Sequence, residues 1–188
     1  MASASAGERL FLAIPLADDA RRGLEAHLAG ALGGDRLSGR PVPARNWHFT
    51  LRFLGDTSAA DVARLREGMR SAVLGPAFDV ELARLGAFRD PRRAAVVWMG
   101  VGAGVDEMRA LAARVERVAV DTGFAPERKP FSPHLTLARV QPPADVRPLL
   151  ARVPPFGGAM RVRQVVLFRS MLGSGPPRYE PVERFALA

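Results

Sequence analysis

Cysteine is absent from the 188 residues, which excludes disulfides, thiolate nucleophiles, iron–sulfur clusters and zinc–thiolate sites. Long apolar runs are also missing. Stretches such as 10–16 and 94–101 are less than half of the roughly 20 residues that a membrane-spanning helix needs, so we expect no membrane association. The segment 1–7 lacks the basic start and long apolar region of a secretory signal. We therefore expect a cytoplasmic protein.

Lysine is nearly absent, because Lys129 is the one lysine among 27 basic residues and the rest are arginine. The formal net charge is +8, and basic proteins attract phosphate polyanions over long range. The arginines are scattered along a chain rich in alanine, glycine and proline, a bias that GC-rich coding also produces. The charge therefore permits a nucleic-acid partner without identifying one.

The length suits one domain, and hydrophobic residues at 48% with charged residues at 24% are ordinary globular usage. Short apolar or alternating runs bounded by turn residues predict strands at 9–15, 47–54, 78–88, 94–101, 134–140, 160–172 and 179–187. Apolar residues at helical spacing predict helices between Asp18 and Gly33, Ser58 and Gly75, Gly104 and Thr122, and Val146 and Val153.

Two helix starts carry capping signals. Asp18 or Asp19 is a candidate cap for the first helix, and Ser58 with Asp61 resembles a capping box for the second. Each half of the chain contains a helix, a loop and a histidine-bearing strand in that order. The two halves are therefore candidates for distant copies of one unit, which suggests two lobes.

The strongest pattern is a repeated tetrapeptide, His48-Phe49-Thr50-Leu51 and His134-Leu135-Thr136-Leu137. It holds two of the three histidines and two of the four threonines, so coincidence is a poor explanation. Side chains alternate along a strand, so each copy presents its histidine and threonine on one face and its two apolar residues on the other. Two such faces are able to line one cleft.

Imidazole titrates near pH 6.5, so a pair of histidines can act as base and acid together at neutral pH. Displacement at phosphorus needs a base for the entering oxygen and an acid for the leaving one, and threonine hydroxyls bind phosphate oxygens. Ordinary half-buried structural histidines are the alternative, and the matched pair argues against it. A metal site lacks a recognisable ligand spacing. His27, within the first helix, is interpreted as a surface residue.

At these residues the chain resembles the 2H phosphoesterases, in particular the branch of 2'-5' RNA ligases or RNA 2',3'-cyclic phosphodiesterases. The resemblance covers nearly the whole chain. It is carried by Arg9-Leu10-Phe11-Leu12-Ala13-Ile14, Arg40-Pro41-Val42, Asn46-Trp47-His48-Phe49-Thr50-Leu51, Phe53-Leu54-Gly55, Pro130-Phe131-Ser132-Pro133-His134-Leu135-Thr136-Leu137-Ala138-Arg139, Arg178-Tyr179 and Phe185-Ala186-Leu187.

The resemblance implies that residues 1–188 form a single α+β domain of two pseudo-symmetric lobes. Each lobe would be an antiparallel sheet with helices on its outer face, and the active cleft would lie between them. It also implies hydrolysis of a 2',3'-cyclic phosphate at an RNA or nucleotide end to a 2'-phosphate, without metal or cofactor. His48 would be the proton donor to the departing 3' oxygen, and His134 the proton acceptor that activates water.

Thr50, Thr136 and Arg139 would bind the substrate phosphate. The five-residue offset places Arg139 on the strand face opposite His134 unless the strand ends or bulges between them. Phe131 and Trp47 are candidates either for stacking on a base or, the simpler interpretation, for core packing. We expect a monomer that acts on RNA or a cyclic nucleotide. A non-catalytic RNA-binding module and a 2'-5' RNA-joining enzyme remain as alternatives.

Overall fold

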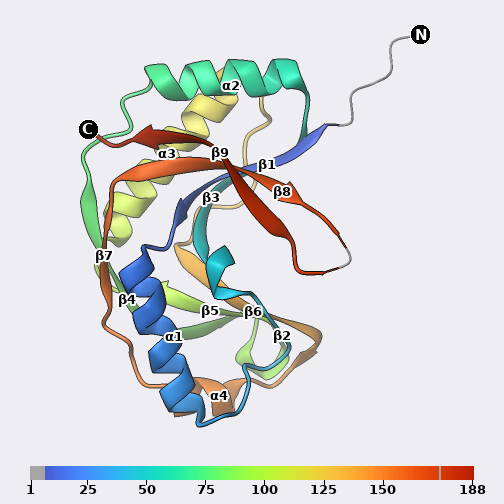
Figure 1. The fold of residues 1–188 in the computed structure, drawn as a ribbon, viewed down its shortest axis with the longest axis vertical. Coiled ribbons are helices and arrows are strands. Elements are labelled where there is room, and N and C mark those ends of the chain that lie inside the picture. The colour runs from blue at the N-terminus through green and yellow to red at the C-terminus, as the bar shows by residue number, and fades with distance from the viewer. Residues whose placement is uncertain (1–6, 174) are drawn as a thin grey trace.

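The computed structural model describes residues 7–173 and 175–188 (Figure 1). Residues 1–6, for which the sequence predicts no secretory signal, and Ser174, between the strands predicted at 160–172 and 179–187, lie outside the described residues. Within the described part, the helices are all too short or too polar to cross a bilayer.

The protein is built from four helices, nine strands and two short 3₁₀ turns over the described residues. The strands are β1 (Glu8–Pro15), β2 (Arg40–Pro41), β3 (His48–Thr57), β4 (Phe78–Phe88), β5 (Ala94–Val101), β6 (His134–Ala144), β7 (Ala159–Val162), β8 (Gln164–Met171) and β9 (Arg178–Ala186). The helices are α1 (Asp18–Leu32), α2 (Ala59–Ser71), α3 (Val105–Asp121) and α4 (Arg147–Arg152), and the turns are η1 (Ala44–Asn46) and η2 (Pro91–Arg93).

The strands form one curled antiparallel sheet in the order β7-β4-β5-β6-β3-β1-β8-β9, with β2 on β6. Its middle is a weak junction, because β3 and β6 share the single registered pair Phe49–Leu135, whereas β1 and β3 pair along eight positions of β1. The junction divides the sheet into a first lobe (β3, β1, β8, β9) and a second lobe (β6, β5, β4, β7). The predicted α+β fold with two pseudo-symmetric lobes is confirmed.

The crossover helices interlock the lobes. Helix α1 joins β1 to β3 but packs against β7 of the second lobe, and its His27 Nε2 lies 2.9 Å from the carbonyl oxygen of Pro154. Helix α3 joins β5 to β6 but packs against β3 of the first lobe. Figure 1 shows this exchange, with α1 beside β4 and β7 and α3 beside α2.

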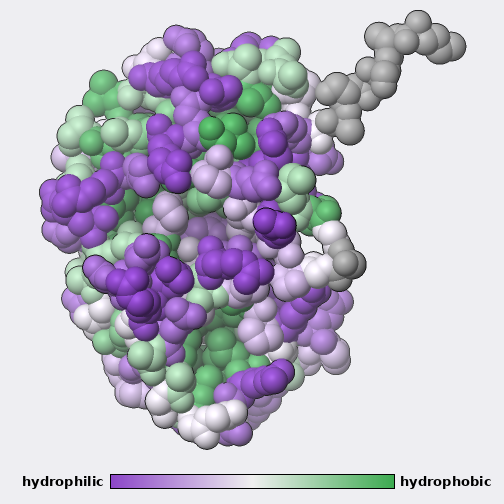
Figure 2. Space-filling view, viewed as in Figure 1, coloured by the Kyte–Doolittle hydropathy of each residue, from purple (hydrophilic) through white to green (hydrophobic). Residues whose placement is uncertain are grey.

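Helix α1 buries Leu24, Leu28 and Leu32, which lie at four-residue spacing on one face. Burial of each such side chain contributes about 1.5–3 kcal/mol to folding. The helix ends at Gly33, whose φ of 57° is the left-handed conformation of a C-cap. The opposite face is exposed to solvent, and Figure 2 shows hydrophilic side chains over the first turns of the helix and less polar ones over its later turns.

The predicted caps have different outcomes. Ser58 caps α2 as expected, accepting a hydrogen bond from the Asp61 backbone N–H at 3.2 Å. The prediction for α1 is wrong, because Ala17 is the N-cap and makes no side-chain bond. Asp18 and Asp19 lie inside the first turn, where they pair with arginines one turn later.

The strand predicted at 160–172 is two strands that break at Arg163. Strand β7 pairs with β4 of the second lobe, and β8 pairs with β1 of the first. Met160 and Val162 are buried before the break, whereas Val165 and Leu167 are buried after it. The side chains that join the hydrophobic core therefore move from even to odd numbers as the chain crosses between lobes, and Val166 is buried on the opposite face.

Candidate active site

The two motif histidines line the same cleft between the lobes, which has a volume of about 1590 Å³. Each is the first residue of its strand, His48 in β3 and His134 in β6. The following residues, Phe49 and Leu135, are fully buried and pair with each other across the lobe junction. Because side chains alternate along a strand, burial of this pair turns both imidazoles toward the opposite face, where the cleft lies.

The two imidazoles make equivalent hydrogen bonds to the backbone. His48 Nδ1 lies 2.7 Å from the carbonyl oxygen of Asn46, and His134 Nδ1 lies 2.8 Å from the carbonyl oxygen of Ser132. A carbonyl oxygen only accepts, so each Nδ1 carries the proton and donates it. In the neutral ring, Nε2 is therefore the unprotonated nitrogen, available to take up a proton.

Burial sets the protonation of the pair. Desolvation lowers the pKa of His48 to about 4, with smaller contributions from the positive charges of His134 and Arg139, and the Asn46 carbonyl opposes the shift. Burial also lowers the pKa of His134, assisted by Arg139 and opposed by the Ser132 carbonyl. Both imidazoles are therefore neutral at pH 7 in the free protein.

Both motif threonines also line the cleft. The Thr50 hydroxyl lies 3.0 Å from His48 Nε2, and with that nitrogen unprotonated the hydroxyl is the donor. Thr136 occupies the equivalent position beside His134. The fold thus brings together on one surface the four motif residues that the sequence singled out, which are His48, Thr50, His134 and Thr136.

A β-bulge brings Arg139 to the same surface. In the pairing of β5 with β6, Val97 lies opposite Ala138 but Trp98 lies opposite Thr136, so Leu137 is an extra residue. The bulge changes the alternation, and Arg139 lines the cleft with His134. Strand β3 bulges at the equivalent Leu51.

Aromatic rings enclose the histidines, a feature that the sequence alone did not indicate. The ring centroids of Phe11 and Tyr179 lie 4.9 and 5.3 Å from that of His48, and Phe88 packs edge-on against His134 at 4.7 Å. They come from β1, β9 and β4, three strands that are distant in sequence from the histidines they contact. Burial under these rings is the physical origin of the lowered pKa values.

The cleft carries an excess of positive charge. Its basic lining residues are Arg9, Arg40, Arg89, Arg109, Arg128, Lys129 and Arg139. Its acidic lining residues are Glu116 and Glu127, and both pair with the buried Arg52, at 2.9 and 2.5 Å. Arg52 compensates one of these two negative charges from behind the cleft, and the basic lining residues outnumber the acidic ones, so the surface as a whole favours an anion.

The remaining candidate residues lie as follows. Trp47 is buried, and its indole N–H donates to the Val42 carbonyl at 3.0 Å, which identifies it as a packing residue. Phe131 is half-buried, packs against the core and also lines the cleft. His27 lies on α1, outside the cleft. No group of three potential metal ligands is found among the described residues.

Proteins with similar sequences are known. The chain is 35% identical over 159 residues to the RNA 2',3'-cyclic phosphodiesterase of Aeropyrum pernix, covering 82% of this chain and 90% of that one. It is 32% identical over 181 residues to the protein of the same name from Escherichia coli, covering 96% and 97%.

Solved structures of similar proteins have the same fold. The crystal structure of Escherichia coli LigT complexed with 3'-AMP matches with a TM-score of 0.80 at 31% identity, covering 96% of this chain and 98% of that one. Residues 17–173 also match the family model described as the 2'-5' RNA ligase superfamily. These residues include both histidine motifs, and the chain therefore belongs to the 2'-5' RNA ligase superfamily.

Proposed function

We propose that this protein hydrolyses 2',3'-cyclic phosphate ends of RNA or nucleotides to 2'-phosphates. The observation that carries the proposal is the matched pair of imidazoles. Both line one cleft, and both are held by Nδ1–H donation to the carbonyl two residues earlier. The relatives named RNA 2',3'-cyclic phosphodiesterase and the 3'-AMP complex of LigT support the substrate class.

In the proposed reaction, His134 Nε2 removes a proton from water as the water oxygen attacks phosphorus. A new P–O bond forms, the bond from phosphorus to the 3' oxygen breaks, and His48 Nε2 donates a proton to that oxygen. The products are a 3'-hydroxyl and a 2'-phosphate. Both proton transfers use side chains of this chain, each contributing roughly 10² to 10⁴ in rate, so the scheme needs no cofactor.

The donor role requires His48 to carry a proton, although burial lowers its pKa to about 4 in the free protein. A bound phosphate brings negative charge beside the ring, which favours the imidazolium and raises its pKa. Substrate binding thus opposes the effect of burial. We assign His48 as the donor on this basis.

The phosphate is held by the remaining polar groups of the site. We assign hydrogen bonds from the Thr50 and Thr136 hydroxyls to its non-bridging oxygens, and charge compensation to Arg139. The Thr50 hydroxyl, which points to His48 Nε2 in the free protein, turns to the phosphate when substrate binds. That movement also frees Nε2 for proton donation.

We further propose that the chain acts as one domain, as a monomer, in cytoplasmic RNA processing. The single-domain proposal is supported by helices α1 and α3, each of which packs on the lobe that it does not connect. Joining a cyclic phosphate to a 5'-hydroxyl through a 2'-5' linkage uses the same groups in the same roles. Water is far more concentrated, so we expect joining to be the minor activity.

The test uses a defined oligonucleotide that ends in a 2',3'-cyclic phosphate, incubated with the protein in EDTA. We expect complete conversion to the 2'-phosphate, identified by which hydroxyl retains the phosphate. His48→Ala and His134→Ala should each lower kcat by about 10² to 10⁴, with binding largely retained. His27→Ala is the matched control, because His27 lies outside the cleft.

Two results would overturn the proposal. Full activity in either histidine variant would remove the acid–base pair. Tight binding of the cyclic end by the wild-type protein without any turnover would instead identify a non-catalytic RNA-binding module.

A further inference from the structure

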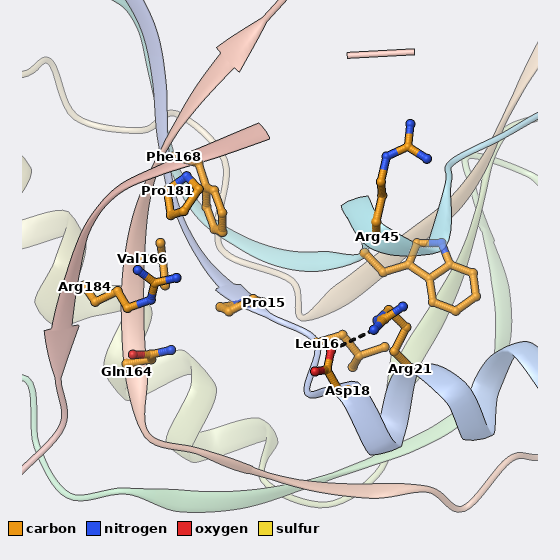
Figure 3. A pocket seen from close by; sticks show the side chains of 11 residues that line it. Pro15, Leu16, Asp18, Arg21, Arg45, Gln164, Val166, Phe168, Pro181 and Arg184 are labelled. Atoms are coloured by element: carbon orange, nitrogen blue, oxygen red, sulfur yellow. Dashed lines mark hydrogen bonds and ion pairs between the residues drawn. The ribbon is translucent and has the colours of Figure 1, made fainter. Parts of the chain in front are cut away.

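A second hollow, of about 350 Å³, lies beside the catalytic cleft (Figure 3). We call it the arginine pocket because three of its lining residues are arginines. It is lined by Pro15, Leu16, Asp18, Arg21, Arg45, Trp47, Gln164, Val166, Phe168, Pro181 and Arg184.

The arginine pocket and the cleft share one face of the first lobe. Pro15 in the pocket is the register partner of His48 in the cleft, and paired strands lie about 4.8 Å apart. Phe168 forms the wall between the two hollows. Its ring stacks on Phe11 of the cleft with a centroid distance of 5.4 Å and lies 6.4 Å from the His48 ring.

Two of the three arginines are available for an anion. Arg45, in η1, and Arg184, in β9, are both exposed, and in the described part of the chain no carboxylate lies within ion-pair distance of either. Arg21 is already held by Asp18 at 2.7 Å, the dashed pair in Figure 3. Figure 3 places Arg45 and Arg184 on opposite walls of the pocket. The two side chains stand well apart across the pocket, so each is placed for a different phosphate of a bound strand.

The rest of the lining suits a nucleotide. Gln164, which Figure 3 shows on the Arg184 side, offers both a hydrogen-bond donor and an acceptor. Phe168 and Pro181 supply apolar surface next to these polar groups. Two exposed arginines bind a free anion weakly, but a strand already anchored at His48 presents its next phosphates at high local concentration. The position therefore favours a polynucleotide over a free phosphate.

We propose that the arginine pocket binds an upstream nucleotide of the substrate strand, so that the enzyme prefers RNA oligonucleotides to cyclic mononucleotides. Arg45 and Arg184 contact the two backbone phosphates that flank this nucleotide, and Gln164 and Phe168 contact its base or ribose. This inference rests on the proposed function, because the strand is positioned by its cyclic end in the catalytic cleft.

The test compares the Arg45→Ala/Arg184→Ala double variant with the wild type on two substrates, a cyclic-phosphate hexanucleotide and a 2',3'-cyclic mononucleotide. We expect the ratio of kcat/KM for the hexanucleotide to that for the mononucleotide to fall about 10-fold, since only the longer substrate reaches the two guanidinium groups. The dependence of hexanucleotide KM on salt should also weaken, with the log–log slope reduced by about 0.7 for each phosphate that an arginine no longer neutralises.

The matched control is Arg36→Ala/Arg117→Ala, which removes two exposed arginines that line neither hollow. It should leave the ratio unchanged. An equal loss in both double variants would show a general charge effect and overturn the inference, as would an unchanged ratio in the pocket variant.

Binding of a hexanucleotide with a 2'-phosphate end, measured by fluorescence anisotropy, separates this inference from the proposed function. Weaker binding by the Arg45→Ala/Arg184→Ala variant alone would support the pocket even if wild-type turnover failed. Equal binding by the wild-type protein and both double variants would overturn the pocket even if turnover succeeded.

Discussion

Phe49 in β3 and Leu135 in β6 face each other across the lobe junction, and each directly follows a motif histidine. Both side chains are fully buried in the core. Their burial on one side of the sheet directs His48 and His134 to the other side. The hydrophobic contact between the lobes therefore also sets the position of the two groups assigned to proton transfer.

Truncation of the buried ring at the junction should destabilise the protein. We expect Phe49→Ala to lower the free energy of unfolding by about 3–5 kcal/mol, because it removes a fully buried aromatic side chain and leaves a cavity. Urea unfolding measures the loss. Phe53→Ala is the control, since Phe53 is 61% exposed, and a similar loss there would contradict the packing argument.

The pH dependence of catalysis follows from the lowered pKa values of both histidines. In the free enzyme the donor must be protonated and the acceptor neutral, so kcat/KM should peak between the pKa of His48, about 4, and that of His134, which lies below 6.5. Bound phosphate raises both pKa values, so the kcat profile should lie at higher pH. A kcat/KM maximum above pH 7 would contradict these protonation states.

The same shift affects stability. The pKa of His48 is about 4 when folded and near 6.5 when unfolded, so the unfolded chain takes up the proton first as pH falls. The contribution of neutral His48 to the free energy of unfolding is therefore fully present above pH 6.5 and is lost as pH falls toward 4. Relative to His48→Asn, the wild type should lose on the order of 2 kcal/mol between pH 7.5 and 4.5, measured by urea unfolding. His27→Asn is the control for loss of an imidazole.

The motif hydroxyls should matter for turnover rather than for folding. Thr50→Val and Thr136→Val each remove a hydroxyl that we propose donates to the phosphate, and we expect kcat/KM to fall about 10- to 100-fold. Serine retains the hydroxyl, so Thr50→Ser and Thr136→Ser should restore most of the activity. If the serine variants were as impaired as the valine variants, the hydroxyls would not be the functional groups.

Arg52 links the first motif strand to the chain that leads into the second motif. It is buried, pairs with Glu116 of α3 and Glu127, and donates to the backbone carbonyl of Ala125. Arg52→Met leaves two partly exposed carboxylates without their cationic partner. We therefore expect the free energy of unfolding, measured in urea, to fall by about 2 kcal/mol. Arg64→Met, which breaks the exposed pair with Asp61, should change stability by less than about 1 kcal/mol.

Much of the local structure follows from the sequence, because it depends on near neighbours in the chain. Alternating apolar residues predicted β3 and β6, Gly33 predicted the end of α1, and Ser58 predicted the start of α2. The predicted cap of α1 was wrong because Ala17 occupies the N-cap position, so Asp18 and Asp19 lie inside the first turn and pair with arginines three residues later.

The sequence by itself determined the candidate residues, which are the histidines and threonines of two strands in a chain without cysteine, and it determined the family, which the comparisons confirm. Only the tertiary structure decided how those groups are arranged. The bulge at Leu137 turned Arg139 into the cleft, and strands remote in sequence supplied the rings that lower the histidine pKa values. The physical reason is that local periodicity reports which residues are buried, whereas pairing register and desolvation depend on segments that meet only when the chain folds.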